Sequence, residues 1–280
     1  MRVHICGARG STPAPGAEFL RYGGHTSCVA VTADGDEAPT LILDAGTGIR
    51  SVTGLLAGQP YAGHILLSHL HWDHVHGLPF FRAGDTPGAR VTLLLPAQPG
   101  GQAAERVLAG CMSPPHFPIT PGELRGEWTF GTVPAEAFKA GPFEVEAYEI
   151  PHKGGATVGY RVSDGRSAVA YLPDHCPTLA GPGPDGWGEY HPAALALARE
   201  VDLLIHDASL LPAELAAEAS FGHAAADYAV GLARHAGART AVLFHHKPDR
   251  TDAALDALGT RLAGPGAPVV VAAERDILQT

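Results

Sequence analysis

Three histidines and one aspartate lie within residues 69–74, which read His-Leu-His-Trp-Asp-His. Imidazole nitrogens and carboxylate oxygens are the usual protein ligands of zinc, manganese and iron. The cluster closely follows the apolar run 65–67, so it begins where a strand is predicted to end. His69 and His71 can point at one ion, and Asp73 and His74 can serve a second ion nearby. We therefore predict a two-metal site here rather than a polar surface loop.

Other apolar runs along the chain also end abruptly in His or Asp. Besides the run before His69, such runs precede His152, Asp174, His206 and His245. The ends of neighbouring strands converge at one edge of a sheet, although they are far apart in sequence. A lone His at a strand end is usually an ordinary hydrogen-bonded residue, but five such ends in one chain favour a shared metal site.

The hydrophobic pattern predicts short strands followed by helices, twice along the chain. Strands are expected over residues 3–6, 27–31, 40–44, 65–67, 91–95, 143–150, 157–162, 167–172, 201–205, 240–244 and 269–272. Helices are expected after the turn at 45–48 to about 56, and over 102–109, 192–199, 223–235 and 252–262. The proline-rich segment 111–142 is expected to be irregular and to form a lid or rim over the site.

This order of elements predicts an α+β fold, a four-layer αββα sandwich in which two sheets lie between helices. A doubly wound parallel sheet is the alternative, but the closely spaced strand pairs resemble hairpins. A chain of 280 residues can form one domain, and we expect residues 1–280 to do so.

Composition narrows the functional classes. With 45% hydrophobic and 17% charged residues, the chain is typical of a globular protein. A formal charge of −10 argues against a broad phosphate-binding surface, so no long nucleic acid is expected as a partner. No apolar run approaches the roughly 18–20 residues that cross a bilayer, and the N-terminus is typical of a strand rather than a signal peptide. We therefore expect a cytoplasmic protein without a membrane partner.

The four cysteines are far apart and form no Cys-x-x-Cys pair, so free buried thiols are expected. The loop at 7–16 is rich in Gly and Pro but lacks the Gly-Lys-Ser/Thr ending of a phosphate-binding P-loop. Neither feature predicts a second functional site.

The pattern at 69–74 resembles the signature motif of the metallo-β-lactamase fold superfamily of dinuclear hydrolases, and Asp44-Ala45-Gly46 resembles its early strand-end motif. In that family the latter Asp supports the histidine loop. The resemblance implies a first metal on His69, His71 and His152, a second metal on Asp73, His74 and His245, and Asp174 as the bridge. His245 is preferred over His246 because it directly follows the apolar run. His246 would point to the opposite side, toward a supporting or substrate-facing position.

Further motifs resemble the tRNase Z-like phosphodiesterases, a branch that includes cyclic-nucleotide and cyclic-phosphate phosphodiesterases. They lie at residues 7–13, 22–27 and 152–162. Gly222-His223 resembles the motif whose His donates a proton to the leaving oxygen, but Ala224-Ala225 replaces the hydroxyl residues common there. The alternative is that His223 caps the following helix. A zinc β-lactamase would use Cys where this chain has Asp174, so the resemblance favours phosphodiester, thioester or lactone hydrolysis.

The resemblance implies two divalent metal ions. Zinc is the expected metal, and manganese and iron are the alternatives. A metal-bridging hydroxide would attack phosphorus, with Asp73 as proton acceptor and His223 as proton donor. Because the chain has no Lys/Arg-rich insertion, we expect a small phosphodiester as the substrate, with a cyclic nucleotide or related cyclic phosphate as the first candidate. The alternatives are a lactone or thioester hydrolase on the same site, and an iron-dependent oxidoreductase of the same fold. A homodimer and a contribution of His206 to the site are left open.

Overall fold

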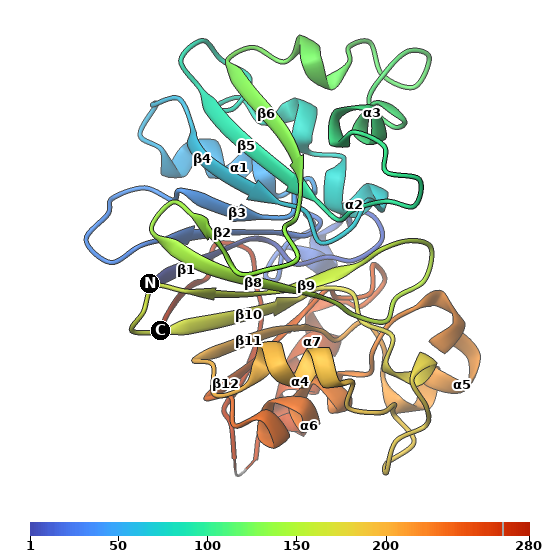
Figure 1. Cartoon of the computed structure of the whole chain (residues 1–280). Coiled ribbons are helices and arrows are strands. Elements are labelled where there is room, and N and C mark those ends of the chain that lie inside the picture. The colour runs from blue at the N-terminus through green and yellow to red at the C-terminus, as the bar shows by residue number, and fades with distance from the viewer. Residues whose placement is uncertain (265) are drawn as a thin grey trace.

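Two seven-stranded mixed sheets face each other, with helices on their outer sides (Figure 1). The computed structural model describes residues 1–264 and 266–280. The first sheet has the spatial order β14 (Ile277–Gln279), β1 (Arg2–Gly7), β2 (Cys28–Thr32), β3 (Leu41–Leu43), β4 (Ala62–Leu66), β5 (Arg90–Leu95) and β6 (Glu127–Thr132). The second has the order β13 (Val269–Val271), β12 (Thr240–Phe244), β11 (Leu203–Asp207), β10 (Ala168–Leu172), β9 (Val158–Ser163), β8 (Phe143–Glu149) and β7 (Phe138–Ala140). The predicted αββα sandwich is confirmed.

Each sheet is antiparallel on one side and parallel on the other. In the first sheet, β3, β4, β5 and β6 are parallel neighbours; in the second, β10, β11, β12 and β13 are. The strands before the parallel group pair as antiparallel neighbours in both sheets. Helices supply the crossovers between the parallel strands, which explains why they follow the strands in each half of the sequence.

The helices are α1 (Ile49–Leu55), α2 (Trp72–Val75), α3 (Ala104–Ala109), α4 (Pro192–Ala198), α5 (Leu215–Glu218), α6 (Ala226–Ala236) and α7 (Asp252–Leu262). In Figure 1, α4, α6 and α7 cover the second sheet. The ends of the two longest helices follow capping rules. The Thr251 hydroxyl accepts a hydrogen bond from the Ala254 N–H at the start of α7, and Gly237 ends α6 at φ 72°.

The central core lies between the sheets. Alternate residues of β1, β2 and β3 face alternate residues of β8, β9 and β10, so a period of two brings their apolar side chains together. Strands β2, β3, β10 and β11 are buried along their whole length. Strands covered on both faces are expected to be mostly apolar, and these four are, apart from Thr32 at the end of β2 and His206-Asp207 at the end of β11.

Two parts of the chain differ from the prediction. Segment 111–142 is not wholly irregular, because β6 and β7 lie within it as edge strands of the two sheets. The alternation of Trp128 and Phe130 with polar residues is a strand signal that the surrounding Gly and Pro residues obscure. Strand β14 was also missed. It pairs with β1, so the end of the chain returns to the first sheet, beside the N-terminus (Figure 1).

The parallel strands deliver the polar cluster to one edge of the sandwich. The loop after β4 carries residues 69–74, while Asp174, Asp207 and His245 lie at or just beyond the ends of β10, β11 and β12. These three strands are parallel neighbours, so their carboxyl ends meet. None of the described helices is long and apolar enough to cross a membrane.

Candidate metal centre

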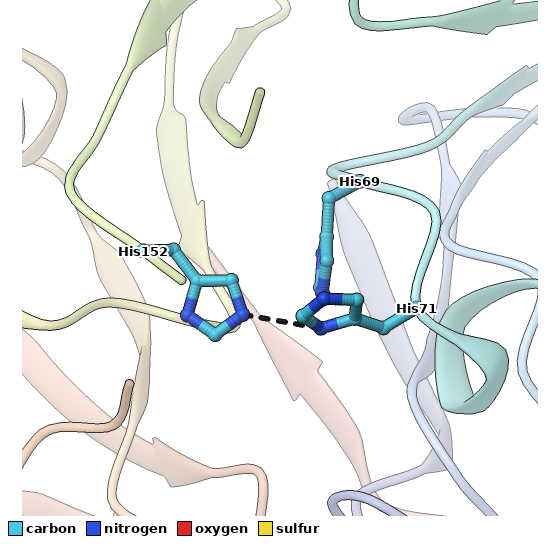
Figure 2. Close-up of side chains that lie close together, drawn as sticks. All are labelled: His69, His71 and His152. Carbon is cyan, nitrogen blue, oxygen red and sulfur yellow. Dashed lines mark hydrogen bonds between the residues drawn. The ribbon is translucent and has the colours of Figure 1, made fainter. Parts of the chain in front are cut away.

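Among the described residues, four overlapping groups of potential ligands form at this edge, and two of them, with three residues each, match the sets that the resemblance implied. The nearest side-chain nitrogens of His69, His71 and His152 lie within 4.8 Å of one another. Figure 2 shows these three rings turned toward a common point, two from the loop after β4 and one from the loop after β8. The His152 Nε2 atom is 3.2 Å from His71 Nδ1.

Ligand atoms of the second group, Asp73, His74 and His245, also lie within 4.8 Å of one another. Asp174 lies between the two groups. One of its oxygens is 2.9 Å from His74 Nε2 and 3.2 Å from His245 Nε2. The other is 3.6 Å from His152 Nε2. The structure thus brings together all seven residues that the sequence predicted as ligands, with Asp174 in the bridging position.

The chemistry of these donors fits divalent cations. Ser68 Oγ donates to Asp44, so it accepts from His69 Nδ1–H, which leaves His69 Nε2 unprotonated. That Nε2 atom is buried and has no hydrogen-bond partner among the described residues. Burial also holds the pKa of His69 well below its usual value, which keeps the ring neutral. The unprotonated, buried Nε2 atom of His69 is therefore available to bind a metal ion.

The spacing of nitrogens supports the same reading. His74 Nε2 and His245 Nε2 are 3.4 Å apart, and the His71–His152 pair is 3.2 Å apart. Two nitrogens at 2.0–2.1 Å from one tetrahedral zinc ion are about 3.3 Å apart. The residues therefore fit a pair of zinc ions or ions of similar size.

Asp44 fixes the loop that carries these ligands. Its carboxylate accepts hydrogen bonds from the Ser68 N–H (2.6 Å), the Ser68 hydroxyl (2.8 Å), His74 Nδ1 (2.7 Å) and the Tyr171 hydroxyl (2.8 Å). Because His74 Nδ1 donates to Asp44, its Nε2 is turned toward Asp174 and Asp73. This is the supporting role that the resemblance implied for Asp44.

The glycine-rich loop near the N-terminus packs directly against the second group. The Ser11 N–H donates to Asp73 Oδ2 at 2.6 Å, and Ser11 has a left-handed φ of 59°. A Cβ atom on Gly10 would lie 2.4 Å from the His245 ring, so only glycine permits this approach. The loop therefore orients two of the three ligands of this group.

His223 lies beside the centre and is held by Asp207. Its Nδ1 atom is 3.0 Å from Asp207 Oδ2 and 3.5 Å from Asp174 Oδ1. Burial opposes protonation, but the carboxylates, Asp207 above all, raise the pKa of His223 to about 9. His223 does not cap α6, whose N-cap is Ala225 without a side-chain hydrogen bond.

Asp207 is the residue of this site that the sequence reasoning missed. The sequence left open a contribution from its neighbour His206, which is buried and donates from Nδ1 to the Asp207 carbonyl oxygen at 2.7 Å. Its Nε2 atom is 3.0 Å from His175 Nδ1, outside the ligand groups. Successive side chains of a strand point to opposite faces, so only one of the two could face the site.

His246 does not face the substrate side. It is buried, its Nε2 atom donates to the Ala272 carbonyl oxygen at 2.8 Å, and burial lowers its pKa to about 3. Of the two expected positions, the structure places it in the supporting one. The preference for His245 as the ligand candidate agrees with the geometry.

An open cavity of about 480 Å³ lies over the ligand groups. Its walls are Ser11, Leu70, His71, Trp72, Asp73, Asp174, Phe221 and His223. Segment 111–142 contributes nothing to these walls, so the expected lid or rim is wrong. Instead, residues 111, 112, 116 and 117 line a separate cavity of about 760 Å³.

Comparison with known proteins supports the assignment of the fold. The family model described as "Beta-lactamase superfamily domain" matches residues 40–246. The chain belongs to this superfamily. Ribonuclease Z of Salinibacter ruber is 30% identical to it, over 88% of this chain and 86% of that protein.

Solved structures of the superfamily show the same fold. Human tRNase Z, short form, superposes with a TM-score of 0.67 at 19% identity, over 100% of this chain and 99% of the other. A diphosphatase from the PhnP family gives 0.70 at 19% identity, over 100% and 97%. The predictions of a metal-dependent hydrolase and of its tRNase Z-like branch are confirmed.

One prediction about partners is wrong. The acidic balance led us to expect no long nucleic acid, yet curated relatives, including those of Salinibacter ruber and Haloferax volcanii, are named ribonuclease Z. RNA is a long nucleic acid. The physical reason is that a formal charge of −10 sums the whole chain, whereas binding depends on the charge and shape of one surface.

Proposed function

We propose that this superfamily member is a two-metal phosphodiesterase. RNA is the preferred candidate for its substrate. The observation that carries the proposal is the pair of ligand groups joined by Asp174, with the His223–Asp207 pair beside the same cavity. A hydrolase of phosphodiesters needs both a charge-neutralising centre and a proton donor for the leaving oxygen.

The proposed ligands are those of the two groups: His69, His71 and His152 for one ion, Asp73, His74 and His245 for the other, and Asp174 for both. Zinc is the first choice, with manganese and iron as alternatives, because His and carboxylate donors suit all three. When bound, two such ions lower the pKa of a water molecule and neutralise charge on phosphate oxygens.

Residues of the chain supply the proton transfers. Asp73 lines the cavity and is held by the Ser11 N–H, so it can accept a proton from the attacking water. His223 also lines the cavity, and Asp207 engages its Nδ1 atom. The remaining Nε2–H can give its proton to the departing sugar oxygen, while Asp207 stabilises the imidazolium and fixes the ring.

The ribonuclease Z relatives support RNA as the substrate. A small, cyclic phosphodiester is the second candidate. None of the described residues that line the cavity is Lys or Arg, so the cavity itself offers no cationic side chain to a long phosphate backbone. We also propose that residues 1–280 form a single domain, because both sheets contribute to one central core.

The test is a hydrolysis screen with the purified chain loaded in turn with zinc, manganese and iron. Substrates are labelled RNA, bis(p-nitrophenyl) phosphate, cyclic nucleotides, a lactone and a thioester. We expect phosphodiester turnover that is lost in Asp174→Asn and kept in His116→Ala, a histidine that lines the separate cavity. Hydrolysis of the lactone or thioester alone, or oxygen consumption with iron, would refute the proposal.

A further inference from the structure

We propose that Trp72 and Phe221 form an aromatic pair at the mouth of the metal cavity that stacks on an unpaired nucleotide base next to the phosphate to be hydrolysed. The inference rests on the proposed phosphodiesterase function and specifies its substrate: a phosphodiester that carries an unstacked base. Neither residue is a ligand, and neither belongs to the proton-transfer pair.

The two rings are unusually exposed for large apolar side chains. Trp72 is 69% exposed and Phe221 is 62% exposed. Other exposed aromatic side chains of the described structure, such as Phe80 and Tyr148, do not line the metal cavity, whereas these two do. Exposed apolar surface at a pocket mouth is typical of a binding site.

Trp72 is held in a fixed orientation. It begins α2 between His71 and Asp73, one residue of each ligand group. Its ring stacks on His76, with 5.5 Å between ring centroids and 8° between the planes. One face of the indole is therefore occupied by a neighbour on the same helix, and the high exposure leaves the remaining surface accessible to a ligand.

Phe221 lines the same cavity from a different part of the chain, the segment after α5. It ends the 3₁₀ helix Ala219–Phe221 and precedes Gly222, which has a φ of 104°. The Gly222 carbonyl oxygen accepts a hydrogen bond from His152 Nδ1 at 2.7 Å. A Cβ atom at Gly222 would be 3.1 Å from the His152 ring. The backbone next to Phe221 is thus held in place by its contact with His152, a proposed metal ligand.

The chemistry of the walls selects the partner. The lining residues that the structure describes include no Lys or Arg, so beyond the proposed ions and His223 the walls offer the rest of a substrate apolar and aromatic surface. Nucleotide bases stack on aromatic side chains regardless of sequence. Inside a duplex both faces of a base are already covered, so an unpaired nucleotide is the matching partner.

Two esters with the same leaving group test the pair: thymidine 5′-(p-nitrophenyl phosphate), which carries a base, and methyl p-nitrophenyl phosphate, which carries none. We expect the zinc-loaded protein to prefer the nucleoside ester in kcat/KM. Trp72→Ala and Phe221→Ala should each reduce this preference by about 5- to 150-fold, the range of base–aromatic stacking. Trp72→Phe should retain most of it, and the control Phe80→Ala, also an exposed aromatic, should change nothing.

A binding measurement separates this inference from the proposed function. Anisotropy of labelled tetrauridylate should show weaker binding in both alanine variants, whether or not turnover occurs. If neither ester is hydrolysed but the alanine variants still bind the tetranucleotide more weakly, the phosphodiesterase proposal fails and the aromatic pair stands. If the methyl ester is hydrolysed while both alanine variants retain the nucleoside preference and the affinity, the aromatic pair is refuted.

Discussion

Removal of His223 should affect substrates according to the basicity of their leaving group. In His223→Ala, RNA hydrolysis should fall by about 10²–10⁴-fold, the usual contribution of a general acid, which corresponds to about 2.7–5.4 kcal/mol of activation free energy. A sugar alkoxide needs a proton to leave, whereas p-nitrophenolate does not. Hydrolysis of bis(p-nitrophenyl) phosphate should therefore change by less than about threefold under the same conditions.

The structure indicates that Asp207 stays hydrogen-bonded in this variant, so we expect the variant to keep its fold. Without His223, Asp207 Oδ2 still accepts hydrogen bonds from the backbone N–H groups of His175 and Ala224, both at 3.2 Å. His223 lies outside both groups of proposed ligands, but it shares another possible ligand cluster with Asp174, Asp207 and His245, so its effect on metal content is measured directly. Rates on the two substrates are compared by kcat at saturating metal, with metal content and Tm measured for each protein. An equal loss on both substrates with unchanged metal content would refute the role of His223 as proton donor.

Three other perturbations test the centre itself. Asp44→Ala removes the acceptor that orients His74 and should lower metal affinity by about 10- to 100-fold, measured by competition with a chelating dye; unchanged affinity would contradict its supporting role. Gly10→Ala places a methyl group 2.4 Å from the His245 ring. Elemental analysis should then find about one bound ion instead of about two. Gly54→Ala, whose added methyl group meets nothing within 4 Å, is the control. Chelation should lower Tm, because ions that bind only the folded chain stabilise it; an unchanged Tm after verified metal loss would contradict a centre formed on folding.

All seven candidate ligands come together in the structure, whereas some of the elements around them were not predicted. His152, Asp174 and His245 could be found because each follows an apolar run, and parallel strands bring such ends together. Asp207 could not be chosen over His206 in this way, because strand periodicity alone does not say which of two adjacent polar residues faces the site. The hydrogen bond between Asp207 and His223 shows that Asp207 faces the site, and it joins residues 16 positions apart in sequence.

The missed strands and the wrong partner prediction have different physical causes. Strand β14 has three residues, and its place is set by pairing with β1 at the other end of the chain, which no local pattern reports. Nucleic-acid binding was not expected because of the net charge, but a net charge does not say where on the surface the charged residues lie. Trp72 and Phe221 were not singled out, because an exposed aromatic residue looks the same in sequence as a buried one.

The candidate metal centre is divided between the two sheets. In each proposed group, two ligands come from the loop after β4 of the first sheet, and the third comes from the second: His152 after β8, or His245 after β12. Asp174, after β10, contacts both groups across that boundary. Neither half of the chain can therefore assemble a complete group alone, and each bound ion would join the two sheets at the open edge of the sandwich. At the other end of the chain β14 joins the last residues to β1, so the halves are linked by backbone pairing as well as by ligands. A displacement of the loop after β4, which supplies two ligands to each group, should therefore affect both ions, whereas Gly10→Ala acts on His245 and should affect the second ion alone.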